Sequence, residues 1–137
     1  MSYASSLPKY LVIAATIGGI FIITKNLIRD TDDQPMVKVE VPKLSTDAIR
    51  GKQLFNDNCS ACHGKNAAGS NSGPPLIHPI YEPNHHADVS FQLAAKRGVR
   101  AHHWPFGNMP PQPQVKPSDV SAIILYVREL QRANGIN

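Results

Sequence analysis

The sequence lacks the motifs of several common functional classes. It contains no nucleophile–base motif, no phosphate-binding loop and no internal repeat, so no catalytic constellation is predicted. It also lacks a dense basic run and any interleaving of basic with aromatic residues, which argues against nucleic acid as a partner. Only two cysteines are present, and no βαβ pattern accompanies them. A redox-active dithiol is expected near such a pattern, and a structural zinc site needs a second pair of ligands, so both are poorly supported.

Both cysteines lie in the segment Cys59-Ser60-Ala61-Cys62-His63, which has the C-x-x-C-H spacing typical of covalent haem attachment. Two thiols three positions apart can each add to one vinyl group on a porphyrin edge. The histidine that follows is then delivered to one face of the iron as an axial ligand. A chance match in a region of small and polar residues is the remaining alternative. We expect one haem c, bound through thioethers to Cys59 and Cys62, with His63 on the iron.

The regions around this motif resemble a class I cytochrome c over residues 46–136, about two thirds of the chain. In that family a helix precedes the haem motif, a Gly-Pro-x-Leu segment follows it, and a methionine beside proline precedes a C-terminal helix. The matching landmarks, in order, are Gly51 and Phe55, Gly73-Pro74-Pro75-Leu76, Asn108-Met109-Pro110-Pro111, and Tyr126. The resemblance implies an all-α haem domain of three main helices with long loops. It also implies a carrier of single electrons rather than an enzyme.

Met109 and Pro74 are the other candidate site residues. Met109 follows His63 by 46 residues and precedes two prolines, which fix φ and so stiffen a loop that holds a weak thioether ligand. Ligation by histidine and methionine raises the reduction potential of a haem, whereas the alternative for a lone methionine is core packing. In the resembled family, the proline carbonyl of Gly-Pro-x-Leu accepts the second N–H of the axial histidine. That role is implied here for Pro74.

Capping oxygens, a basic last turn and a C′ glycine indicate where the helices of the haem domain, residues 45–137, begin and end. The expected helices run from about Thr46 to Asn58, from Asp88 as a cap to Arg97 before Gly98, and from Pro117 or Ser118 to near Gly135. The core stripe of the last helix comprises Val120, Ile123, Ile124, Val127 and Leu130. Phe55 and Tyr126 are expected to touch where the first and last helices cross, and the resemblance implies that Gly51 permits a close approach there.

An almost uninterrupted apolar run extends from Tyr10 to Ile23, and Leu27-Ile28 extend it beyond the polar residues Thr24, Lys25 and Asn26. It spans 19 residues, near the roughly 20 that cross a bilayer core. We expect residues 1–29 to form a retained, single-pass membrane anchor, so the lipid bilayer is one expected partner. A cleaved signal peptide is the main alternative, but no Ala-x-Ala-like site follows the run. A buried helix of a soluble domain is less favoured, because the run has no polar face.

The orientation of the anchor in the membrane is not decided by charge, because basic residues lie at both ends of the apolar run. It is inferred instead from the side of the membrane on which haem is attached. In bacterial c-type cytochromes haem is attached outside the cytoplasmic membrane, so we expect the haem domain on the periplasmic side of the inner membrane. Residues 30–44 are expected to form a flexible tether. The alternation of Val37, Val39 and Val41 allows a short edge strand within it, and packing of the tether against a partner subunit is the alternative.

The net charge of +4 lies entirely within residues 42–137, which hold ten basic and six acidic side chains. A positive field steers association with acidic surfaces. The expected electron donor is a quinol-oxidising cytochrome bc-type complex or a periplasmic dehydrogenase, and the expected acceptor is a terminal oxidase or a photosynthetic reaction centre. Two alternatives stay open: a fixed electron-transfer subunit of a larger membrane complex, weakly favoured by Gly18-Gly19 in the anchor, and a haem gas sensor or enzyme with an open iron position.

Five histidines outside the haem motif lie in the expected loops around the middle helix: His78, His85, His86, His102 and His103. They allow a second metal site, since imidazoles suit copper or zinc, replacement of methionine on the iron, or hydrogen bonds to haem propionates together with Trp104. Hydrogen bonding to the backbone of the loops is the simplest alternative. Adjacent histidines in an extended segment point apart, so neither pair is expected to form a bidentate site by itself.

Overall fold

In a computed structural model of the chain, residues 12–20 and 34–137 are described. The chain divides into two compact units, Met1–Gln34 and Pro35–Asn137. Residues 12–20 of the first unit are helical, and most of the predicted anchor 1–29 lies outside the described residues. Within the described ranges, no helix combines the length and the apolar character that a membrane crossing requires. The anchor therefore stays a prediction.

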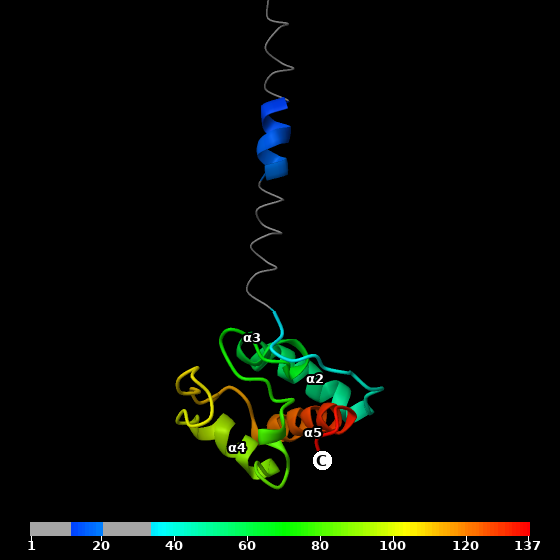
Figure 1. The fold of residues 1–137 in the computed structure, drawn as a ribbon, viewed down its shortest axis with the longest axis vertical. Coiled ribbons are helices and arrows are strands. Elements are labelled where there is room, and N and C mark those ends of the chain that lie inside the picture. The colour runs from blue at the N-terminus through cyan, green and yellow to red at the C-terminus, as the bar shows by residue number, and fades with distance from the viewer. Residues whose placement is uncertain (1–11, 21–33) are drawn as a thin grey trace, which may run out of the picture. The chain divides into compact units, whose positions relative to one another are not determined.

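The second unit is helical, and its three main helices are those that the sequence predicts (Figure 1). Two short helices follow α2, and one 3₁₀ turn precedes α4. In chain order the elements are α2 (Thr46–Asn58), α3 (Ser60–His63), η1 (Lys65–Ala67), η2 (Pro79–Tyr81), α4 (Asp88–Arg97) and α5 (Pro117–Ala133). Residues 34–137 contain no named strand, only isolated bridges between Ser70 and Gly73 and between Val99 and Met109.

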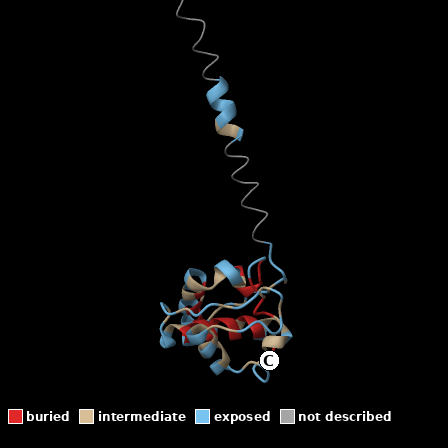
Figure 2. Cartoon of the chain, turned by 90° about the vertical axis from the view of Figure 1, so that its left-hand side faces the viewer, coloured by how far each residue is buried: buried red, intermediate tan, exposed pale blue. Residues whose placement is uncertain are grey.

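The core forms where α5 packs on α2 and, less extensively, on α4. In Figure 2 the buried residues gather along α5, whose predicted core stripe is buried throughout. At the crossing with α2, the rings of Phe55 and Tyr126 lie 5.7 Å apart between centroids, and both residues are fully buried. A Cβ on Gly51 would come within 2.0 Å of the Ala122 carbonyl oxygen. The predicted close approach of the two helices is therefore present, and it requires glycine.

Local signals locate the ends of the helices closely. Ser45 caps α2 by accepting a hydrogen bond from the Ala48 N–H, and its own N–H and hydroxyl donate to Glu129 on α5. The prediction that Asp88 caps α4 is wrong, because Ala87 occupies the N-cap position and makes no side-chain hydrogen bond. Asp88 lies instead in the first turn, where its carboxylate accepts from a buried arginine of α5, Arg128.

The structure differs from the predicted tether 30–44 over its last ten residues, 35–44. The N–H groups of Met36 and Val37 both donate to the Ala68 carbonyl, at 3.0 and 3.1 Å. Further along, Glu40 and Asn134 exchange two hydrogen bonds of 2.9 and 2.8 Å. Alternating side chains of this segment, Val37 and Val39, pack on the core. Residues 35–44 thus belong to the second unit as an extended segment outside any strand, while residues 30–33 lie outside the described part of the chain.

Candidate functional site

A cavity of about 400 Å³ opens between the loops and helices of this domain, and its lining is mainly apolar. Four of the five predicted site residues line it: Cys59, His63, Pro74 and Met109. Cys62 is exposed and is not part of the lining. The volume falls within the range of roughly 300–1,000 Å³ that is usual for small-molecule and cofactor sites. Cys59 and Met109, which are 50 positions apart in the sequence, thus line the same apolar cavity.

The Cys-x-x-Cys-His segment begins at the break between α2 and α3 and includes the whole of α3. Cys59 ends α2, with its N–H donating to Phe55, and it also begins α3. The His63 N–H donates back to the Cys59 carbonyl at 2.9 Å, which closes one helical turn over the motif. Burial, and next the neighbouring Cys62, raise the pKa of the Cys59 thiol to about 11. One turn therefore carries both thiols and the imidazole, of which Cys59 and His63 line the cavity and Cys62 faces solvent.

The His63 ring is oriented by the segment that follows the motif. Its Nδ1 lies 2.8 Å from the Pro74 carbonyl oxygen. A carbonyl can only accept, so Nδ1 carries the proton and Nε2 keeps a free lone pair. Burial lowers the pKa of His63, and the bond to Pro74 partly opposes this. Gly73 brings the segment close, because a Cβ there would lie 2.8 Å from the Cys62 carbonyl oxygen. His63 is thus held neutral and oriented, which is what a metal-binding imidazole requires.

The backbone of Met109 is fastened to the end of α4. Val99 and Met109 exchange two backbone hydrogen bonds, at 3.0 and 2.9 Å. Gly98, with φ +75°, turns the chain out of the helix at this point, and a Cβ there would lie 2.4 Å from the Met109 carbonyl oxygen. The Asn108 side chain accepts from the Ala101 N–H and closes the loop between them. The methionine therefore stands on a short bridged loop beside the cavity.

The polar groups of the cavity fit a haem. Trp104 lines the cavity, and its Nε1–H is the one buried side-chain donor that finds no partner among the described residues. Burial raises the pKa of Tyr81, and the nearby Trp104 N–H opposes this rise without completing a hydrogen bond. An unpaired buried donor costs about 1–3 kcal/mol and calls for an acceptor in the bound molecule. A haem has an apolar ring for the walls and carboxylates that accept such a bond.

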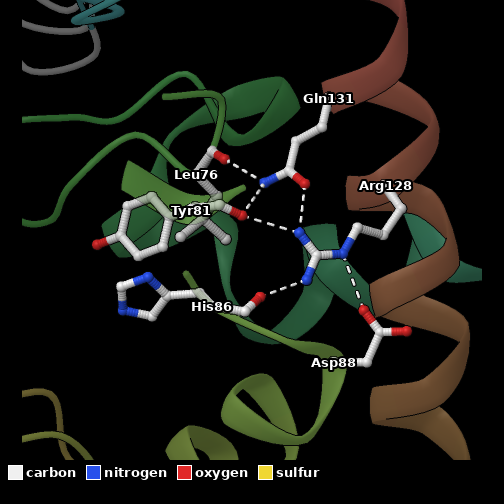
Figure 3. Close-up of polar contacts among 6 residues, drawn as sticks. All are labelled: Leu76, Tyr81, His86, Asp88, Arg128 and Gln131. Carbon is white, nitrogen blue, oxygen red and sulfur yellow. Dashed lines mark hydrogen bonds and ion pairs between the residues drawn. The ribbon is translucent and has the colours of Figure 1, made fainter. Parts of the chain in front are cut away.

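Two polar residues of α5 that the sequence does not single out, Arg128 and Gln131, hold one wall of the cavity. Arg128 is 6% exposed, and its guanidinium donates to the Asp88 carboxylate, the Tyr81 and His86 carbonyls and the Gln131 side chain (Figure 3). Gln131 is fully buried and donates to the Leu76 and Tyr81 carbonyls, at 2.9 and 3.1 Å. The available signal was their spacing of three, which places both on the same face as the core stripe.

The loop histidines converge, contrary to the expectation that adjacent histidines point apart. The chain turns at Glu82, whose carbonyl accepts hydrogen bonds from the N–H groups of both His85 and His86. The ring centroids of these two histidines are 4.7 Å apart. The ring centroids of His102 and His103 are 4.1 Å apart, and those of His103 and His86 are 5.4 Å apart. Desolvation, and next the neighbouring imidazoles, lower the pKa of His103. The fifth histidine, His78, packs its ring on Trp104 instead.

Comparison with known proteins agrees with this geometry. The model of the family described as cytochrome c matches residues 48–131, which is more than half of the chain. Neither the curated proteins nor the solved structures contain a match. The matched segment begins in α2 and ends in α5, and it includes the haem motif, Pro74 and Met109. Membership implies a haem c, for which the spacing of Cys59 and Cys62 is suited, and electron transfer through it. The chain belongs to the cytochrome c family.

Proposed function

We propose that this protein is a class I c-type cytochrome that carries single electrons with one haem, bound through Cys59 and Cys62 and ligated by His63 and Met109. The observation that carries the proposal is that His63 and Met109 line one apolar cavity while Pro74 orients the His63 ring. A haem bound there supplies reversible one-electron chemistry at its iron.

The protein's own residues prepare this site in three ways. His63 keeps its proton on Nδ1 and offers Nε2 as a neutral ligand. The bridge between Val99 and Met109 holds the backbone of Met109 beside the cavity. The apolar lining excludes water, and an apolar site favours the less charged redox state of a haem bound in it. Closure by two protein ligands is suited to electron transfer rather than to binding of a gas or substrate.

The proposed setting is the periplasmic side of a bacterial inner membrane, with residues 1–29 as the anchor. The apolar run of 19 residues supports the anchor. Electron exchange with a cytochrome bc-type complex or dehydrogenase, and then with a terminal oxidase, is supported by the net positive charge of residues 42–137. This charge predicts that electron exchange with an acidic redox partner slows as ionic strength rises.

Optical spectra of the full-length protein test the ligation. We expect the weak band of ferric iron bound to methionine sulfur, and no change when carbon monoxide is added to the reduced protein at neutral pH. Ready binding of carbon monoxide, or absence of the band, would contradict ligation by Met109 and favour an open iron position.

Membrane fractionation tests the anchor separately. The full-length protein should sediment with membranes and resist extraction by high salt, and a variant without residues 1–29 should be released with an unchanged haem spectrum. If the full-length protein is released by salt alone, the anchor proposal is wrong while the haem proposal stands.

A further inference from the structure

Three histidines outside the haem motif come together at the rim of the cavity. His85, His86 and His103 each offer a ring nitrogen, and these three atoms lie within 4.8 Å of one another. Two of the residues come from the turn before α4, and the third comes from the loop between Val99 and Met109. Because the three histidines belong to two loops that are distant in the sequence, the fold and not the local chain brings their rings together.

One member of the group, His86, makes the hydrogen bond to a backbone carbonyl that metal-ligating histidines usually make. His86 Nδ1 lies 2.6 Å from the Ile80 carbonyl, which can only accept, so the ring donates through Nδ1 and leaves Nε2 free. Its backbone carbonyl is fixed by the buried guanidinium of Arg128. A second N–H bonded to a backbone carbonyl is the arrangement that fixes the tautomer and direction of ligating histidines. His86 is thus the rigid point of the group.

We propose that His85, His86 and His103 bind a divalent transition-metal ion of the kind that prefers imidazole, Zn²⁺ or Cu²⁺. The group contains no carboxylate, which argues against the hard ions Ca²⁺ and Mg²⁺. His85 and His103 are exposed, so an ion can enter from solvent and a water can complete the usual four ligands. The site is distinct from His63 and Met109, the ligands proposed for the haem iron.

A bound ion would join two loops that both border the haem cavity. His86 and His103 line that cavity, and the loop carrying His103 ends at the bridge that positions Met109. An ion held by both loops restricts their separation in the folded state and has no equivalent site in the unfolded chain. The metal therefore stabilises the fold by preferential binding to it.

Calorimetric titration of the haem-loaded, full-length protein, prepared without a histidine tag, tests the site with zinc chloride. We expect one zinc per chain, and at least about tenfold weaker binding in His103→Ala and in His85→Ala. The matched control is His102→Ala. His102 is the neighbour of His103 in the same loop, but it is not a member of the group and its Nδ1 is bonded to the Arg100 carbonyl. Binding in this control should be close to that of the parent protein.

Two further readouts separate this site from other modes of binding. Zinc should raise the melting temperature of the parent protein and of His102→Ala, but not that of His103→Ala, whose far-ultraviolet spectrum without zinc should match the parent. The band of methionine-bound ferric iron should not change with zinc. Equal loss in His102→Ala and His103→Ala, binding unaffected by His103→Ala, or loss of the methionine band on adding zinc would each overturn the assignment.

Discussion

Arg128, buried in α5, donates a hydrogen bond to the backbone carbonyl of His86, which lies 42 residues earlier in the chain. The same guanidinium reaches the Tyr81 carbonyl and the Asp88 carboxylate. The C-terminal helix thereby fixes the turn that separates η2 from α4. That turn contributes both to the wall of the haem cavity and to the histidine group, so one arginine supports two sites.

Replacement of Arg128 by lysine tests this role. The planar guanidinium serves four acceptors at once, whereas an ammonium group cannot match that geometry. We expect Arg128→Lys to lower the free energy of unfolding by about 2–4 kcal/mol, chiefly because buried carbonyls lose their donors. The ion pair itself contributes little, since the Asp88 side chain is 66% exposed. Urea denaturation of the haem-loaded protein measures the change.

The control for this substitution is Arg132→Lys, at an exposed position of the same helix. It should change the free energy of unfolding by no more than about 0.5 kcal/mol. Equal losses in the two variants would show that Arg128 acts only as a charged residue of α5, and that the bonds to the turn do not stabilise the domain.

Gly51→Ala should destabilise the protein because of the crossing of α2 and α5, although the same substitution usually stabilises an exposed helix. In an exposed helix, alanine is better than glycine by up to about 1 kcal/mol. Here the added Cβ would lie 2.0 Å from the Ala122 carbonyl oxygen, and backbone on both sides prevents an easy adjustment. We expect a net loss of about 2 kcal/mol or more in urea denaturation. Gln53→Ala, at an exposed site of α2, should be nearly neutral, and a stabilised Gly51→Ala would contradict the packing described.

Much of this fold follows from local sequence signals. The bounds of α2, α4 and α5 agree with the predictions to within about two residues, because capping groups, proline and glycine act over one turn. The spacing of the Cys-x-x-Cys-His motif predicts Cys59, Cys62 and His63, and the prolines beside Met109 favour it as a ligand. The role of Pro74 follows only from the resemblance to class I cytochromes c. The sequence predicts a tether over residues 30–44, because alternating valines beside charged residues do not reveal whether a partner surface exists. Residues 35–44 instead bond to and pack on the rest of the second unit.

Long-range contacts were the part that the sequence did not reveal. The histidine pairs converge only because the chain turns at Glu82 and because the loop ending at Met109 folds over that turn. Arg128 was missed for the same reason, since each of its three acceptors outside α5 comes from the segment 81–88. The spacing of Arg128 places it on the same face of α5 as the core stripe, but no local pattern shows which carbonyls it will meet.

Because Tyr126 is buried, its contribution to the stability of the fold depends on pH in the alkaline range. Its pKa is raised from the ordinary 10.0 to about 12, because the folded state keeps the phenol neutral. Its hydroxyl also donates to Asn66, at 3.3 Å, which only the neutral form can do. A raised pKa means that this contribution to stability is complete below pH 10, the unfolded value, and is lost as the pH rises towards 12. Urea midpoints between those two values should fall more steeply for the parent protein than for Tyr126→Phe, and parallel curves would contradict the assignment.

Gly98 connects the backbone turn after α4 with the ligand role proposed for Met109. Gly98→Ala adds strain at φ +75° and places a Cβ 2.4 Å from the Met109 carbonyl oxygen, so the bridge to Val99 must open. Gly107→Ala is the matched control, because its φ of +82° carries similar strain while nothing lies within 4 Å of the added Cβ. We expect the band of methionine-bound ferric iron to weaken, and carbon monoxide to bind after reduction, in Gly98→Ala only. If both variants keep the band, the bridge does not position the ligand. If both lose it equally, strain in the loop is the cause, and the close contact at Gly98 has no special part in holding the thioether.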